Sequence, residues 1–173
     1  QVIAPFVMEY AAGRTPNPCF RCNPRVKFGA MLQAAEALGA QRIATGHYVR
    51  VCERNGRIGL RRGADPLKDQ SYVLAGLSQE QLGRALFPLG AMTKEAVRAE
   101  ARRLRLPALE RPESQEVCFA PRQDYRAFLE QRLGVPAPGP ILSTAGKARG
   151  EHRGLIHYTI GQRKGLGISA PRP

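Results

Sequence analysis

Residues 23–47, NPRVKFGAMLQAAEALGAQRIATGH, decide the fold class of this chain. Asn23 is a favoured N-cap, Pro24 suits the first helical position, and apolar residues recur at helical spacing until Gly39. The stretch Arg42–Thr45, RIAT, with Ile43 and Ala44 at its centre, then predicts a short buried strand. A helix that leads into such a strand is the repeating unit of a parallel α/β sheet, whose ligands bind at the carboxyl ends of the strands. The sequence therefore predicts an α/β fold.

The segments beyond this unit predict a hairpin, several helices and a second domain. Asn55-Gly56 lies between two runs of alternating apolar residues, which is a strong hairpin signal. Helices are expected at 68–75, at 79–86 after the cap Ser78, at 94–106 after the cap Thr93, and at 125–133, and a strand at Ile141-Leu142 before a turn at Ala145-Gly146. The proline-rich VPAPGP at 135–140 is the predicted domain junction.

On its amino-terminal side the helix is preceded by GRTPNPC at 13–19, which predicts a loop because its prolines lack amide donors. The chain begins without a first strand and stops in mid-pattern, so we expect an interior piece of a longer protein.

The composition narrows the class of partner. The 173 residues include 27 Lys plus Arg and 14 Asp plus Glu, a formal charge of +13. Such an excess favours a polyanionic partner, although a generally basic proteome is the alternative. No apolar run reaches the length of a membrane span and the start lacks a signal-peptide pattern, so a soluble, cytoplasmic protein without membrane contact is expected.

Two of the four cysteines form a C-x-x-C pair, Cys19 and Cys22, directly before the predicted helix. A helix N-terminus and neighbouring cations favour a thiolate, so the pKa of Cys22 is expected to be depressed. Four interpretations stand side by side: part of a structural zinc site, a thioredoxin-like redox pair, a nucleophile or resolving thiol that works with a distant cysteine, and inert burial. Cys118, in a polar loop after Ser114–Glu116, is the distant partner, whereas Cys52 fits a small buried or edge position.

Further candidate residues follow the predicted strand. His47 stands at a strand C-terminus, where ligand sites of α/β proteins lie, and Gly46 would let a nucleotide approach the backbone closely. Lys68, Asp69 and Gln70 either contact phosphate or form an ordinary polar helix start.

Five strings in this order resemble the tRNA-specific 2-thiouridylase family over nearly the whole chain. They are GRTPNPCFRCN at 13–23, ATGHY at 44–48, LKDQSYVL at 67–74, SQEVCF at 114–119 and IHYTIGQRKGLGI at 156–168. The family's ATP-binding Ser-Gly-Gly-Val-Asp-Ser loop and its C-terminal β-barrel are absent from the chain. The resemblance implies the back part of a Rossmann-like adenine-nucleotide (PP-loop) hydrolase domain, residues 1–133, followed by the start of a small mixed α/β central tRNA-binding domain, residues 134–173.

The resemblance also implies a reaction. Family members use ATP, with Mg2+, to adenylate the C2 oxygen of the wobble uridine of tRNA, and a cysteine persulfide then replaces that oxygen with sulfur. Cys118 matches the persulfide cysteine, and Cys22 matches the cysteine that attacks the persulfide and is left in a Cys22–Cys118 disulfide. The sulfur arrives from a persulfide-donating relay protein.

Other residues match by position. Asn17, Pro18 and Cys19 match contacts to the target base, Gly46 a nucleotide contact, and His47 and Lys68 to Gln70 contacts to tRNA. Some members carry an aspartate where this chain has Cys19, so an acid or base role of that residue is not carried over. A non-enzymatic, zinc-containing RNA-binding module is the alternative from another functional class.

Overall fold

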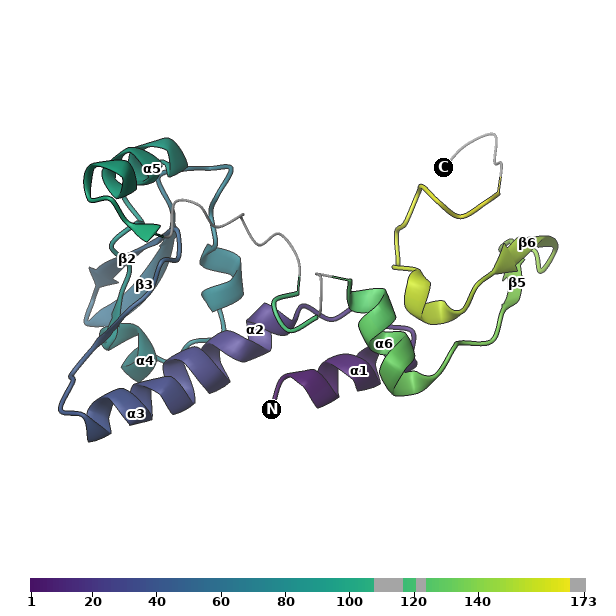
Figure 1. Ribbon diagram of the computed structural model, residues 1–173, viewed down its shortest axis with the longest axis horizontal. Coiled ribbons are helices and arrows are strands. Elements are labelled where there is room, and N and C mark those ends of the chain that lie inside the picture. Colours follow the sequence, from purple (N-terminus) through teal and green to yellow (C-terminus); the bar gives the residue numbers. More distant parts are fainter. Residues whose placement is uncertain (108–116, 121–123, 169–173) are drawn as a thin grey trace. The chain divides into compact units, whose positions relative to one another are not determined.

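The computed structural model describes residues 1–107, 117–120 and 124–168 (Figure 1). These residues form two compact units, each with its own apolar core. The first unit contains residues 19–107, and the second contains 2–18 together with the described residues after 116. Within these ranges no helix is both long and apolar enough to cross a membrane.

A continuous helical run dominates the first unit. It consists of α2 (Pro18–Cys22), the π-helix η1 (Asn23–Ala30) and α3 (Met31–Ala37), which Figure 1 shows as one purple-to-blue coil. The predicted helix is confirmed, but its predicted start is wrong. Cys22 already has helical angles, φ −64° and ψ −44°, so Asn23 lies inside the run and is not an N-cap. The predicted loop correspondingly ends before Pro18.

The π-helix has a physical cause in its surroundings. The Met31 N–H donates to the carbonyl of Val26, five residues back, and the Gln81 side chain donates to the Pro24 and Phe28 carbonyls at 2.8 and 2.9 Å. A side chain that inserts into the hydrogen-bond ladder in this way is a recognised cause of local irregularity in a helix. Gln81 comes from α4 (Gln79–Gly83), so the widened turn is fixed by a contact distant in sequence.

The predicted strand over 42–45 is confirmed in a shorter form in which only Ile43 is buried, and its parallel pairing is confirmed. β1 (Ile43–Ala44) pairs in parallel with β4 (Ala85–Leu86). The expected helix over 79–86 is wrong at its end, because α4 stops at Gly83. The last residues of the predicted helix pair with β1 instead. The Ile43 N–H donates to the Arg84 carbonyl, and the Thr45 N–H donates to the Leu86 carbonyl.

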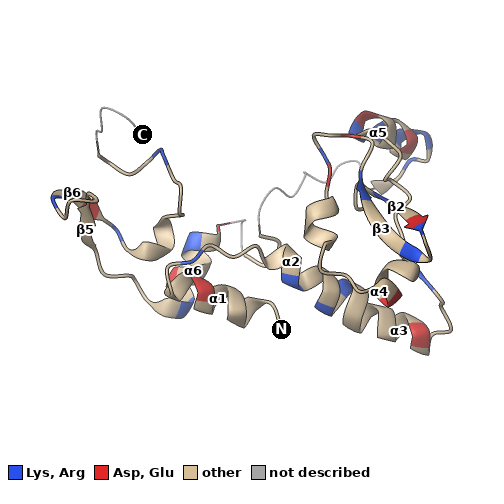
Figure 2. Ribbon diagram, turned by 180° about the vertical axis from the view of Figure 1, so that it is seen from behind, with Lys and Arg blue, Asp and Glu red and all other residues tan. Residues whose placement is uncertain are grey.

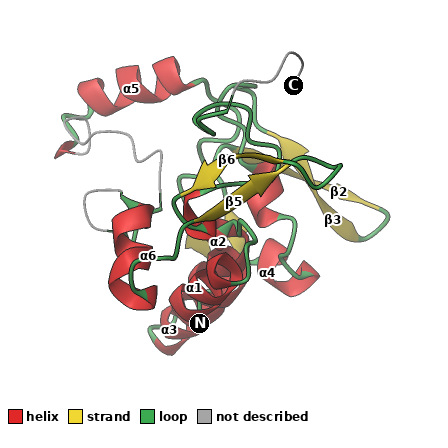
Figure 3. Cartoon of the chain, turned by 90° about the vertical axis from the view of Figure 1, so that its right-hand side faces the viewer, coloured by secondary structure: helices red, strands yellow, loops and turns green. Residues whose placement is uncertain are grey.

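The predicted hairpin is confirmed. β2 (Val49–Arg54) and β3 (Arg57–Arg62) pair antiparallel, and Asn55 and Gly56 both have positive φ, 52° and 68° (Figure 3). Two successive residues at positive φ form the turn whose twist suits a two-residue hairpin, and Asn-Gly tolerates it.

The other predicted helices of the first unit are confirmed with changed limits, whereas the helix predicted over 125–133 in the second unit is confirmed with the same limits, as α6 (Tyr125–Leu133). The expected helix over 68–75 shrinks to a 3-10 turn, η2 (Ser71–Leu74), and α5 (Lys94–Arg103) ends early because Arg105 has φ 51°. Ser78 caps α4 in a complete capping box with Gln81, and Thr93 caps α5. The first core is formed by Phe28, Leu32, Ile43, Val49, Val73, Leu74, Leu77, Leu82 and Ala85.

The second unit packs two helices around a small aromatic core. Its elements are α1 (Ile3–Ala11), α6 (Tyr125–Leu133), β5 (Gly139–Leu142), β6 (Ala148–His152) and η5 (Leu155–His157). Phe6, Tyr10, Phe128, Leu129 and Ile156 form most of the core. The predicted strand at Ile141-Leu142 and the turn at Ala145-Gly146 are confirmed, since β5 and β6 pair antiparallel around them.

Candidate functional site

A pocket opens in the first unit at the carboxyl end of β1. Its volume is about 330 Å³, and its lining residues come from three segments: Lys27 and Met31 from the helical run, Thr45, Gly46 and His47 from the loop after β1, and Gln70 from the turn before η2. Ligands of α/β proteins bind at this end of parallel strands. The structure therefore brings together Gly46, His47 and Gln70, three residues singled out from the sequence.

His47 is a buried residue in the lining of this pocket. It is 6% exposed, and its Nδ1 lies 2.8 Å from the Thr45 hydroxyl. Its ring forms a three-membered cluster with those of Phe28 and Phe87, whose centroids lie 6.2 Å from it and 5.9 Å from each other. Burial lowers the pKa of His47 to about 4, and the positive charge of Lys27 contributes to the shift. At neutral pH His47 is therefore a neutral hydrogen-bonding group.

Gln70 is tied to the loop that carries His47. Its side-chain oxygen accepts a hydrogen bond from the backbone N–H of Tyr48 at 3.1 Å, and the backbone N–H of Gln70 donates to the Tyr48 carbonyl at 3.0 Å. The backbone of Gly63 also approaches this carbonyl so closely that a Cβ there would lie 2.7 Å from it. These contacts fix the wall of the pocket.

Lys68 and Asp69 stand beside Gln70 but do not line the pocket. The Asp69 carboxylate accepts from the N–H groups of Gly63 and Ser71 and from the Ser71 hydroxyl. Burial raises the pKa of Asp69, but these hydrogen bonds outweigh it and the pKa lies below its usual value. Asp69 therefore shapes the turn that presents Gln70.

The C-x-x-C pair lies in the first turns of the helical run. Cys19 is exposed and Cys22 half-buried, and none of the four cysteines forms a disulfide. The expectation that a helix begins just after Cys22 is wrong, because Cys22 ends α2 and continues into η1. Next to it, Asn23 is 1% exposed and donates to the carbonyls of Cys19 and Val73 at 3.0 and 3.1 Å.

The remaining sequence-derived residues lie elsewhere. Asn17 is exposed just before α2, and Pro18 is the first residue of that helix. Cys118 belongs to the second unit and is exposed in a turn closed by the Ala120 N–H and the Val117 carbonyl. Its expected polar neighbours Ser114–Glu116 lie outside the described residues.

Three lining residues were missed from the sequence: Lys27, Met31 and Thr45. Lys27 and Met31 are four residues apart on one helical run, and that spacing places their side chains on one face. Thr45 directly precedes Gly46 in the same ATGHY string. With the helix phase known, these residues could have been found.

The lining of the pocket suits a ligand that combines negative charge with polar groups. Lys27 supplies a positive charge, the exposed backbone of Gly46 allows close approach, and His47 and Gln70 supply neutral polar groups. No carboxylate lines the pocket, so its residues offer no protein ligand of the kind Mg2+ prefers. Within the described part of the chain, no group of three or more Cys, His, Asp or Glu side chains is arranged to hold a metal ion.

Comparison with known families gives two consecutive matches. Residues 1–122 match the family described as tRNA methyl transferase HUP domain, and residues 126–173 match the tRNA methyl transferase PRC-barrel domain.

Curated relatives match over the whole chain. The tRNA-specific 2-thiouridylase MnmA of Nitratidesulfovibrio vulgaris (strain Miyazaki F) is 54% identical, over 99% of this chain and 50% of the relative. The protein of the same name from Thermobifida fusca is 55% identical, over 97% of this chain and 45% of the relative. The protein of this name from Leptospira biflexa is 49% identical, over 100% of this chain and 46% of the relative. The chain thus spans about half the length of the curated relatives it matches.

Proposed function

Because the chain belongs to the family of the tRNA-specific 2-thiouridylases, we propose that the intact protein is an ATP-dependent tRNA sulfurtransferase that converts the wobble uridine to 2-thiouridine. The observation that carries the proposal furthest is the pocket at the end of β1. It joins Gly46 and His47 to Gln70, residues that the resemblance assigns to nucleotide and tRNA contacts.

The proposed reaction needs a leaving group, because a pyrimidine carbonyl oxygen does not leave unaided. ATP adenylates that oxygen and pyrophosphate departs. The terminal sulfur of a Cys118 persulfide then attacks C2, and AMP leaves with the oxygen. Cys22 attacks the sulfur of Cys118, the S–S bond to the transferred sulfur breaks, and its electrons complete the thiocarbonyl. A Cys22–Cys118 disulfide remains, which a thiol reductant returns to two thiols.

Further roles belong to the same proposal. Asn17, Pro18 and Cys19 contact the target base, and Lys68, Asp69 and Gln70 contact tRNA together with His47. A persulfide-donating relay protein supplies the sulfur, and the protein acts in the cytoplasm. Mg2+ accompanies ATP, and the described pocket gives no support for a protein ligand to it. Residues 1–133 form the later part of the PP-loop domain, and residues 134–173 begin the central domain.

The decisive experiment uses the full-length protein with ATP, a persulfide donor and unmodified tRNA. Digestion and mass spectrometry should detect 2-thiouridine, and neither Cys22→Ser nor Cys118→Ser should form it. Cys52→Ser is the matched control, because Cys52 is assigned no role and should leave the rate unchanged. Normal thiolation by Cys118→Ser would contradict the proposal.

A zinc-containing RNA-binding module without enzymatic activity is the second candidate. It requires a further set of ligands around the C-x-x-C pair, and the described residues provide no such set. Metal analysis of the purified full-length protein separates the two candidates. Zinc that is stoichiometric and tightly held, together with inactive protein, would favour this alternative.

A further inference from the structure

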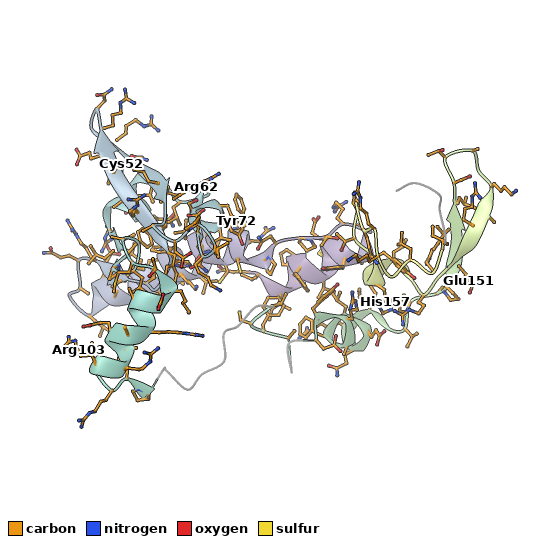
Figure 4. All side chains as sticks on the ribbon, turned by 90° about the horizontal axis from the view of Figure 1, so that it is seen from above. Cys52, Arg62, Tyr72, Arg103, Glu151 and His157 are labelled. Carbon is orange, nitrogen blue, oxygen red and sulfur yellow. The ribbon has the colours of Figure 1, made fainter. Side chains whose placement is uncertain are left out.

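The β2–β3 hairpin carries one face made almost entirely of arginine. Successive strand residues point to opposite faces, and directly paired residues point to the same face. The register pairs Arg50 with Arg61 and Arg54 with Arg57. All four side chains are exposed and share one face. Only Cys52 and Gly59, which pair between them, complete that face (Figure 4 labels Cys52).

The opposite face of the hairpin is used by the fold. Val49 is fully buried there, and Ile58 and Leu60 pack against the first core. The single acidic residue of the hairpin, Glu53, pairs with Ile58 and therefore lies on this same side. The arginine face thus has no carboxylate of its own, and Figure 2 shows Lys and Arg at both ends of β3.

This arrangement is unfavourable for the isolated hairpin. Like charges that lie directly opposite each other across two strands destabilise the pair, and here two such pairs occur. The Nε of Arg50 donates to the Arg62 carbonyl at 2.9 Å, so one guanidinium is held in place by the neighbouring strand. A ligand that brings negative charge to the face would offset the repulsion.

We propose that Arg50, Arg54, Arg57 and Arg61 form a binding surface for the phosphate backbone of RNA. The inference rests on the proposed function, which makes tRNA the substrate. β2 begins two residues after His47, and the arginine pairs at its base and tip are separated by four strand residues, or roughly 13 Å. The arginine face therefore begins at Arg50, three residues along the chain from His47 of the pocket, and supplies guanidinium groups for several phosphates of a polynucleotide.

The chemistry of the face favours a nucleic-acid backbone over a lipid surface. Guanidinium groups bind phosphate oxygens through paired hydrogen bonds, and contacts of this kind position a nucleic acid without reading its sequence. A membrane-binding surface combines basic residues with large apolar side chains that enter the lipid. This face offers only Cys52 and Gly59 between its arginines.

The test compares two variants of the full-length protein that lose equal charge. Arg54→Gln/Arg57→Gln removes the pair at the hairpin tip, and Arg98→Gln/Arg102→Gln removes two exposed arginines of α5. Binding of unmodified tRNA is measured over a series of salt concentrations. Each lost phosphate contact lowers the slope of log K against log[salt] by about 0.7 to 0.9. The hairpin variant should bind about 10-fold more weakly with a slope smaller by about 1.5, and the α5 variant should bind like the wild type.

Thermal melting of each variant shows whether weaker tRNA binding results from loss of folded protein. Because the substitution removes a repelling pair, the hairpin variant should melt at the same temperature as the wild type or higher. Equal tRNA binding by the two variants, or weaker binding with an unchanged salt slope, would overturn the inference. So would loss of binding to mixed phosphatidylcholine and phosphatidylserine vesicles while tRNA binding persists. If the wild type forms no 2-thiouridine, the proposed function is contradicted. The binding surface on the hairpin is tested separately, by the tRNA-binding assay.

Discussion

The helix turn that carries Cys22 and the turn that carries Cys118 differ in how the chain holds them. Next to Cys22, the buried Asn23 donates to two backbone carbonyls, one of them 50 positions away, and Gln81 donates to two more carbonyls of the same helical run. Cys118 stands exposed between Val117 and Phe119, which pack against the second core. Hydrogen bonds therefore fix one thiol segment, and apolar packing on either side anchors the other.

This difference fits the two proposed roles. A thiol that receives sulfur from a donor protein and passes it on must be accessible, and Cys118 is exposed. A thiol that resolves the intermediate benefits from a fixed position. If the comparison is correct, substitutions around Cys22 should alter stability strongly, and substitution of Cys118 should not.

The largest effect is expected from Asn23→Ala. The change leaves the buried carbonyl of Val73 and the part-buried carbonyl of Cys19 without this donor and creates a small cavity, so the free energy of unfolding of the full-length protein should fall by about 3 kcal/mol. Hydrogen exchange of peptides from the first unit measures this loss. Unchanged protection of the Cys22 segment would show that Asn23 does not hold it.

Acid should weaken the same unit. The folded-state pKa of His47, about 4, lies below the ordinary value of 6.5, so the stability it contributes is present above pH 6.5 and is lost as the pH falls towards 4. The loss amounts to about 3 kcal/mol. Hydrogen exchange at a series of pH values should show this loss in the first unit.

His47→Gln should flatten that acid dependence, because glutamine does not titrate. His157→Gln, in the second unit, is the control and should keep the loss. An identical pH profile in the wild type and His47→Gln would refute the assignment.

A smaller effect is expected from Gln81→Ala. It removes two hydrogen bonds to η1 carbonyls together with half of the capping box of α4, a loss of about 2 kcal/mol. Ser78→Ala is the matched control, since it removes the other half of the box and leaves the η1 bonds in place. Urea unfolding should rank Gln81→Ala as the less stable of the two, and the reverse order would contradict the role of Gln81 in the helical run.

The smallest effect on stability is expected from Cys118→Ser. The side chain is exposed and the replacement is similar in size, so the free energy of unfolding should change by less than about 0.5 kcal/mol. Thiolation should nevertheless be lost. A large drop in melting temperature would mean that Cys118 supports the fold, and the contrast with the Cys22 segment would disappear.

Local signals in the sequence were sufficient where structure depends on neighbours along the chain. Asn55-Gly56 predicts its hairpin turn, and Ser78 and Thr93 predict their helix caps, because each acts within a few residues. The start of the long helix and the strand β4 were missed for the opposite reason. Asn23 is a good N-cap by type, yet it is buried against Val73, and β4 exists only through its pairing with β1.

The candidate site shows the same division. Gly46, His47 and Gln70 were all named from the sequence, but that Gln70 lies beside the other two depends on its hydrogen bonds to the backbone of Tyr48, 22 positions away. Lys27 reaches the pocket because of the phase of a helix whose start was predicted too late.

Gln81 has a consequence for redesign of this chain. At the third position of a capping box, glutamine and glutamate are ordinarily interchangeable, because either supplies the oxygen that accepts the N-cap N–H. Here the amide nitrogen of the same side chain also donates to the Pro24 and Phe28 carbonyls, and a glutamate would set a negative charge against those two oxygens. A design method that evaluates each helix end by itself would accept Gln81→Glu, and the substitution would weaken the hydrogen bonds that hold the segment next to Cys22.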